Sequence, residues 1–196
     1  MNASEHIVDA YFRLVLGCFT LGDKKVVKGN NRQLDLLAYH LKTREAFHIE
    51  VAVTHQMNWC VRLEELGPHF DKKFFGLPDE RKGAANGTTD FEKGKVYWEQ
   101  INATYEDVGF EPDQVKRVWV CWIIKGADGA APIETQFYSK HLNRTFPIQI
   151  LSLRDFVLPR LQDKIGTANY DDELLRVLGF VKQRELQTAM VPRRRA

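Results

Sequence analysis

Two acidic residues interrupt two apolar segments that a short turn connects, and this pattern restricts the fold more than any other feature of the chain. Residues 33–41 and 47–53 have the apolar character of β-strands, and residues 42–44 form a turn between them. Asp35 lies within the first segment and Glu50 within the second. A charged side chain in such a strand costs free energy unless it is paired or bound to a metal. Each carboxylate therefore needs a partner.

Hairpin geometry predicts that the two carboxylates share one face of a sheet. Closing residues 42–44 with a two-residue loop places Asp35 opposite either Glu50 or Ala52. In both registers Asp35 and Glu50 lie directly or diagonally opposite, about 5–8 Å apart at Cβ. Like charges repel at that distance, and a divalent cation relieves the repulsion. Oxygen ligands of this kind suit Mg²⁺ or Mn²⁺.

The rest of the chain has the patterns of alternating helices and strands. Before the hairpin we expect a helix that Ser4 caps and Gly17 ends, and then a strand at residues 24–28. After the hairpin we expect a short helix at 59–66, a polar loop at 76–89, a helix at 91–108, strands at 117–124, 134–139 and 148–151, a helix that opens at 152–155, and a last helix at 171–187. This order predicts an α/β sandwich with a central mixed sheet flanked by helices.

The length and the composition are those of one folded domain. The chain has 196 residues, of which 44% are hydrophobic and 28% are charged, so residues 1–190 can supply one core. Residues 191–196 contain three consecutive arginines and form a basic tail. No segment is apolar over the roughly 18 residues of a membrane helix, and the first residues lack the regions of a signal peptide. We therefore expect a cytoplasmic protein without a membrane partner.

The segments around the two carboxylates resemble a nuclease signature. Residues 28–38 read Lys-Gly-Asn-Asn-Arg-Gln-Leu-Asp-Leu-Leu-Ala, and residues 48–53 read His-Ile-Glu-Val-Ala-Val. A helix with a glutamate, a strand with an aspartate after a Gly-Asn-rich turn, and a neighbouring strand with Glu-x-Lys form the signature of the PD-(D/E)xK nuclease superfamily. Its members include restriction endonucleases and junction resolvases. The matching residues in this sequence are Glu5, Asp35 and Glu50.

The resemblance implies a restriction-endonuclease-like fold and a metal-dependent DNA endonuclease that hydrolyses phosphodiester bonds in restriction, phage defence or repair. Asp35, Glu50 and the backbone carbonyl of Val51 would hold Mg²⁺ or Mn²⁺. Glu5 would assist catalysis through water or a second metal. The residues of the turn before the Asp35 strand would bind the DNA: Lys28, Asn30, Asn31 and Arg32. Cutting both strands often needs two active sites, so we also expect a homodimer.

One position departs from the signature. Where the superfamily has lysine, two residues after the glutamate, this sequence has Ala52. That lysine positions or activates the attacking water and stabilises developing negative charge. We expect another group to replace it, first of all Lys25 on the neighbouring strand. The further candidates are Lys24, Lys28, Lys72, Lys73 and His55.

Two other classes of function remain open. If no lysine replaces the missing one, the chain is a nucleic-acid-binding module with a nuclease fold whose catalysis has lapsed. A third interpretation is a protein-interaction domain, which the formal net charge of +2 allows.

The candidate residues also have simpler interpretations. In these interpretations Asp35 pairs with Arg32 or Lys25 on a solvated edge strand, Glu50 is an exposed strand residue, and Glu5 stabilises a helix N-terminus. His48 shares the Glu50 face by parity, and we expect it to form a cross-strand hydrogen bond.

Overall fold

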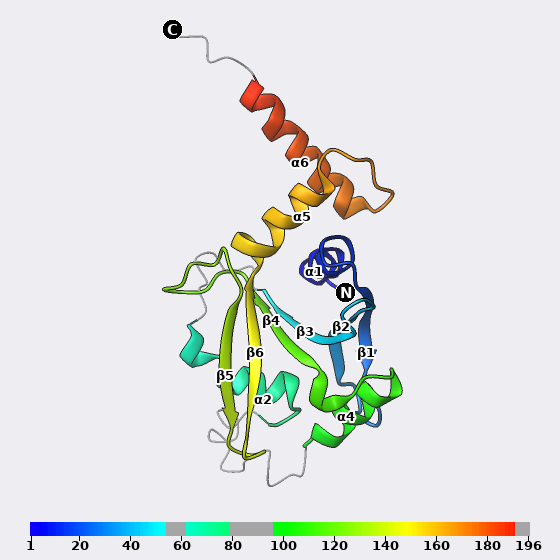
Figure 1. The fold of residues 1–196 in the computed structure, drawn as a ribbon, viewed down its shortest axis with the longest axis vertical. Coiled ribbons are helices and arrows are strands. Elements are labelled where there is room, and N and C mark those ends of the chain that lie inside the picture. The colour runs from blue at the N-terminus through cyan, green and yellow to red at the C-terminus, as the bar shows by residue number, and fades with distance from the viewer. Residues whose placement is uncertain (54–61, 79–95, 191–196) are drawn as a thin grey trace.

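The fold is seen in a computed structural model, which describes residues 1–53, 62–78 and 96–190 (Figure 1). A six-stranded mixed sheet forms its centre. In their order along the sheet, the strands are β1 (Phe19–Lys25), β2 (Gln33–His40), β3 (Glu45–Ala52), β4 (Lys116–Cys121), β6 (Arg144–Ser152) and β5 (Ile133–Ser139). The helices in chain order are α1 (Ala3–Ala10), η1 (Tyr11–Val15), η2 (Leu63–Glu65), α2 (Gly67–Phe74), α4 (Trp98–Asp107), η4 (Pro112–Gln114), η5 (Leu153–Val157), α5 (Leu158–Ile165) and α6 (Glu173–Met190).

The sheet begins as an antiparallel meander and continues with parallel strands. β1 pairs with β2 and β2 with β3 in antiparallel orientation. β4 then pairs parallel with β3, and β6 pairs parallel with β4. β5 closes the far edge as an antiparallel partner of β6. This arrangement confirms the predicted α/β sandwich with a central mixed sheet.

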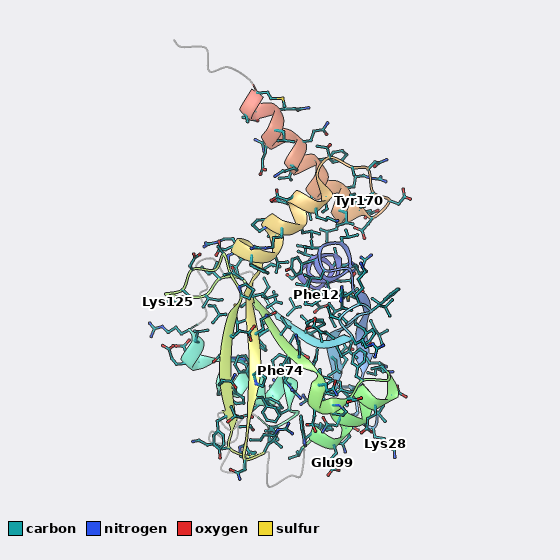
Figure 2. All side chains as sticks on the ribbon, viewed as in Figure 1. Phe12, Lys28, Phe74, Glu99, Lys125 and Tyr170 are labelled. Carbon is teal, nitrogen blue, oxygen red and sulfur yellow. The ribbon has the colours of Figure 1, made fainter. Side chains whose placement is uncertain are left out.

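Helices cover both faces of the sheet. On one face, Phe12 beneath α1 packs with Leu36, Ile49 and Val157. On the other face, Phe74 of α2 packs in a core with Trp119, and α4 supplies further residues to a neighbouring core (Figure 2). Because side chains alternate along a strand, consecutive residues of β2, or of β3, face the helices on opposite sides of the sheet.

The hairpin has one of the two predicted registers. Leu36 pairs with Ile49 and His40 with Glu45, so residues 41–44 form a four-residue loop in place of a two-residue one. The same register places Asp35 opposite Glu50.

The boundaries of the first elements differ from the prediction. The N-cap of α1 is Asn2, whose side chain accepts hydrogen bonds from two backbone N–H groups, so the assignment of Ser4 as the cap is wrong. The predicted strand at 24–28 is also misplaced, because β1 ends at Lys25. Lys28 and Asn30 have positive φ values of 52° and 55°, which cannot continue a strand.

Several expected elements are changed or lie outside the described residues. Sequence patterns did not indicate α2, which follows directly after the expected helix at 59–66. The part of the chain outside the described residues contains the first three residues of that expected helix, most of the loop at 76–89, the start of the expected helix at 91–108 and the basic tail at 191–196. Within the described part of the expected helix, only η2 is helical. In the part of the chain that the structure describes, no helix has the length and apolar character needed to cross a membrane.

Candidate functional site

Three charged side chains from three elements meet on the face of the sheet that α2 covers. Asp35 comes from β2, Glu50 from β3 and Lys73 from α2. Lys73 Nζ lies 2.7 Å from Glu50 Oε2 and 3.3 Å from Asp35 Oδ1. Glu50 is only 1% exposed and Asp35 8%, whereas the Lys73 side chain is 38% exposed. The carboxylates of the cluster are therefore buried, and its lysine side is open to solvent.

The strand pairing brings the two carboxylates together. Asp35 lies opposite Glu50 at the point where the regular β2–β3 ladder ends after Leu36 and Ile49. There the backbone N–H of Val51 donates a hydrogen bond of 2.9 Å to Asp35 Oδ2. The backbone of β3 thus holds the Asp35 carboxylate beside Glu50, as the predicted hairpin geometry requires.

Helix α2 is fixed so that Lys73 faces this cluster. Pro68 lies in the first turn of the helix, where proline is tolerated. Phe70 and Phe74 are buried one turn apart and contact the ring of Trp119, at centroid distances of 5.5 and 6.1 Å. Lys73 directly precedes Phe74. The aromatic packing of α2 therefore determines where the ammonium lies.

Arg32 holds the last turn of α2 from the other side. Its Nη1 donates a hydrogen bond of 2.6 Å to the carbonyl oxygen of Lys72. Its guanidinium also lies 5.0 Å from the ring centroid of Tyr97, within cation–π range. Burial lowers the pKa of Arg32, and the Glu50 carboxylate opposes this effect. Arg32 therefore supports the cluster, in contrast to the simpler interpretation in which it pairs with Asp35.

A buried chain of hydrogen bonds ends at Glu50. His48 Nε2 lies 2.8 Å from Glu50 Oε1, and His48 Nδ1 lies 2.7 Å from the hydroxyl of Tyr105 in α4. Burial, together with the charge of Arg117, lowers the pKa of His48 to about 3, so the ring is neutral near pH 7. Burial raises the pKa of Tyr105, which keeps its hydroxyl protonated. The consistent arrangement has Tyr105 donating to Nδ1 and the Nε2–H donating to Glu50.

The cluster has an unusual electrostatic balance. Burial, followed by the charge of Glu50, raises the pKa of Asp35 to about 6. Burial also raises the pKa of Glu50. Burial lowers the pKa of Lys73, but the two carboxylates outweigh this effect and the pKa is raised. Two carboxylates and one ammonium leave one net negative charge in a desolvated place, and a bound cation would neutralise it.

The donor set fits a magnesium-like ion better than a zinc-like one. Glu50 Oε2 is buried and lies 2.7 Å from the Lys73 ammonium. No group of three or more His, Cys, Asp or Glu side chains suited to a metal occurs in residues 1–53, 62–78 and 96–190. Mg²⁺ commonly uses one or two carboxylates and keeps several waters. Asp35 and Glu50 could supply these two carboxylates, and the adjoining Val51 backbone could supply a further oxygen.

Two of the predicted catalytic residues lie elsewhere. Lys25 pairs with Gln33 at the exposed end of β1, and it is not among the charges that act on Asp35. The predicted contact of Lys25 with the carboxylates is therefore corrected, since the ammonium next to them belongs to Lys73. The side chain of Glu5 accepts hydrogen bonds from the backbone N–H and the side-chain amide of Asn2, both at 2.7 Å. It caps α1, as the simpler interpretation expected.

The remaining candidates surround the turn between β1 and β2. Lys28 and Asn31 are exposed, and the Asn30 amide donates a hydrogen bond of 3.1 Å to the hydroxyl of Tyr97. Lys24 forms an ion pair of 2.6 Å with Asp107. The last candidate, His55, lies outside the described residues.

Replacing His48 with alanine is expected to lower the free energy of unfolding by about 3 kcal/mol. The change opens a cavity and removes a hydrogen-bond partner from both Glu50 and Tyr105, which are buried. Urea unfolding at pH 7, followed by circular dichroism, measures the loss. His6→Ala is the matched control, because His6 lies on the exposed side of α1 and should change stability by less than about 0.5 kcal/mol. Equal losses in the two variants would contradict this role of His48.

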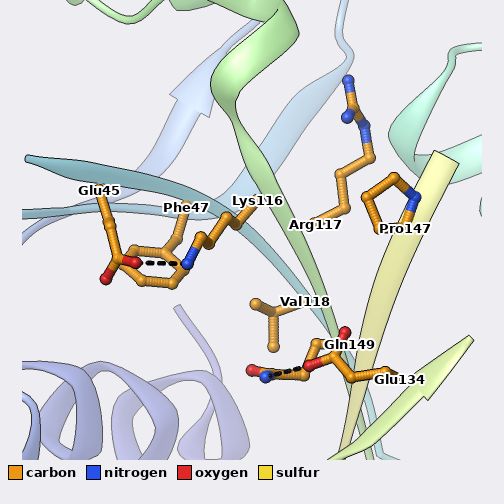
Figure 3. A pocket seen from close by; sticks show the side chains of 8 residues that line it. All are labelled: Glu45, Phe47, Lys116, Arg117, Val118, Glu134, Pro147 and Gln149. Carbon is orange, nitrogen blue, oxygen red and sulfur yellow. Dashed lines mark hydrogen bonds and ion pairs between the residues drawn. The ribbon is translucent and has the colours of Figure 1, made fainter.

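A second hollow lies at the opposite end of β3 (Figure 3). It has a volume of about 340 Å³ and includes Phe47 and Val118. Its carboxylates already have partners, because Lys116 pairs with Glu45, and Gln149 donates to Glu134 at 2.7 Å. The remaining charged side chain of the hollow is the cation Arg117. It therefore offers a divalent cation fewer unpaired carboxylate ligands than the Asp35–Glu50 pair does.

Comparisons with known proteins add no relative. No family model matches the chain, and neither a curated protein nor a solved structure matches it. The function must therefore be inferred from the geometry and chemistry of the cluster.

Proposed function

We propose that the protein is a metal-dependent DNA endonuclease of the PD-(D/E)xK type. The observation that carries the proposal is the cluster itself, in which the Lys73 ammonium lies within 3.3 Å of carboxylates from two neighbouring strands. The resemblance of the sequence around Asp35 and Glu50 supports the same conclusion. That resemblance depends on a helix followed by two neighbouring strands that carry the aspartate and the glutamate, and α1, β2 and β3 have this order in the chain.

The two carboxylates would hold Mg²⁺ or Mn²⁺ together with the Val51 backbone and water. Such an ion supplies a nucleophilic water and neutralises charge on a phosphodiester. Asp35 and Glu50 suit this role because they are held rigidly, the first by the Val51 N–H and the second by His48. Rigid ligands bind an ion without first losing conformational freedom.

Lys73 would perform the work of the lysine that Ala52 replaces. Its ammonium lies at the open side of the cluster, where it can hold an attacking water and stabilise negative charge on the phosphoryl oxygens. Ala52 itself packs against the aromatic core beneath α2. A strand lysine is thus exchanged for a helix lysine that reaches the same two carboxylates.

DNA would approach over the surface next to Lys73. Lys72 and Lys28 are exposed on the two segments that flank the cluster, and exposed lysines are common contacts of the phosphate backbone. Restriction, phage defence and repair all use such cleavage.

One observation favours a second function. Without a metal, the Lys73 ammonium already lies 2.7 Å from Glu50 and offsets part of the negative charge. A nuclease-fold module that binds nucleic acid without cutting it would have the same arrangement. A cleavage assay with Mg²⁺ and Mn²⁺ on duplex, branched and single-stranded DNA separates the two functions.

Asp35→Ala is expected to remove Mn²⁺ binding and DNA cleavage together. Titration calorimetry on the wild type and the variant measures the first, and the cleavage assay measures the second. Glu45→Gln is a suitable control, because Glu45 begins the same strand as Glu50 but pairs with Lys116. Equal Mn²⁺ affinity in wild type and Asp35→Ala would exclude a metal site here.

The same titration has an expected pH dependence. Mn²⁺ binds the ionised carboxylate, and the pKa of Asp35 is raised to about 6. The affinity should therefore be nearly constant above pH 7 and should fall by about tenfold for each pH unit below 6, as protons compete with the metal.

A further inference from the structure

Helix α6 projects from the rest of the molecule and leaves apolar side chains uncovered. It is 18 residues long, and only Leu175 and Gly179 on it are buried. Its first turns pack on α5 and α1, and Lys182 forms an ion pair of 2.9 Å with Asp163 of α5. Beyond this contact the helix runs away from the sheet (Figure 1). Val181, in the same part of the helix, is 43% exposed.

Four residues form a stripe on the side of α6 that faces away from the molecule. They are Glu173, Val177, Phe180 and Arg184, and all four are exposed. Val177 is 56% exposed and Phe180 61%, which is high for large apolar side chains. Their separations of 4, 3 and 4 residues place them on one helix face and match the a and d positions of a coiled coil.

The stripe is complementary to itself in antiparallel orientation. Because the separations are the same from either end, a second α6 running in the opposite direction would place Arg184 opposite Glu173 and Phe180 opposite Val177. A two-fold axis then produces each contact twice. Neither Glu173 nor Arg184 forms an ion pair with another described residue, so both charges are available for such a contact.

We propose that α6 pairs with α6 of a second copy of this chain as an antiparallel two-helix interface centred on Val177 and Phe180. Charge complementarity and the symmetric spacing select a second copy as the occupant. The interface is independent of the metal cluster, so it stands whether or not the protein cuts DNA. One helix pair buries less area than a standard interface, so the dimer should be reversible, with a dissociation constant in the micromolar range.

Sedimentation velocity of the full chain, from about 1 to about 300 μM, tests the proposal. The wild type should shift from monomer to dimer, and Phe180→Asp should weaken the dimer at least tenfold. Phe19→Asp is the matched control, because Phe19 is 66% exposed but lies on β1. Circular dichroism should show that both variants are folded.

A charge exchange tests the orientation of the two helices. Glu173→Arg and Arg184→Glu should each weaken the dimer, since each places like charges opposite one another twice. The double variant should regain the wild-type dissociation constant within about threefold. The proposal is overturned if the wild type remains a monomer at the highest concentration, or if Phe19→Asp weakens the dimer as much as Phe180→Asp does. A double variant as weak as the single ones would also overturn it. So would a monomer that binds anionic lipid vesicles through α6.

Discussion

Replacing Lys73 with alanine should reduce the rate of DNA cleavage by about a hundredfold to a thousandfold. The ammonium is the only cationic group of the described residues within ion-pair distance of both Asp35 and Glu50. Its loss leaves two buried carboxylates without their cation, so the variant should be less stable than the wild type, and circular dichroism should show that it is folded at the assay temperature. Single-turnover cleavage in Mn²⁺ measures the chemical step directly.

The same substitution should strengthen metal binding. Lys73 contributes a positive charge beside two carboxylates, and a divalent cation must bind next to that charge. Removing it raises the negative charge of the cluster, so the affinity for Mn²⁺ should rise while the rate falls. A residue that only supports the structure would not produce these opposite effects.

Two controls distinguish Lys73 from ordinary basic residues. Lys72 neighbours it on α2 but is exposed, so Lys72→Ala should weaken DNA binding and reduce its salt dependence without changing the cleavage rate of bound DNA. Lys25→Ala should change neither, because Lys25 lies at the end of β1, away from the carboxylates. If Lys25→Ala abolished cleavage and Lys73→Ala did not, the assignment of the ammonium would be wrong.

The sequence was sufficient to predict the two facing carboxylates because their relation is local. Asp35 and Glu50 lie on strands joined by a short loop, and the apolar pattern together with that loop restricts the register to two choices. The sandwich architecture follows from the order of elements in the same way.

The position of the lysine depends on packing between distant segments, which no local pattern contains. α2 reaches the cluster because Phe70 and Phe74 pack on Trp119 of β4. A signal for the helix was present, since Pro68 is followed by two aromatic residues four apart. A helix at these residues favours Lys73 over the other groups that could replace the lysine missing at Ala52.

The sequence indicates only part of the hydrogen-bond chain that ends at Glu50. The side chain of His48 faces the same way as Glu50 by strand parity, which the sequence indicates. Its second partner, Tyr105, comes from α4, 57 positions away in the sequence. Contacts at such a separation require the tertiary fold, so the cross-strand bond predicted for His48 is corrected to a bond within β3 and one to α4.

Ala52→Lys should restore cleavage to a protein that lacks Lys73. Ala52 follows Glu50 by two residues on the same face of β3, so a lysine there could direct its ammonium toward the carboxylates. In the Lys73→Ala background we expect a gain of about tenfold to a hundredfold, limited by the apolar packing that surrounds Ala52. Val53→Lys is the matched control, because Val53 packs in the core on the opposite face.

The outcome in the wild-type background decides between the enzyme and the binding module. If Lys73 already performs the role of the strand lysine, adding Ala52→Lys to the wild type brings a second ammonium to one cluster, and like-charge repulsion should lower Mn²⁺ affinity without raising the rate. If the wild type shows no cleavage in Mg²⁺ or Mn²⁺ on duplex, branched or single-stranded DNA, yet Ala52→Lys gains it, then Lys73 only neutralises the carboxylates. The protein is then a binding module whose catalysis has lapsed, because a single ammonium at the strand position restores the chemistry that the helix position does not support.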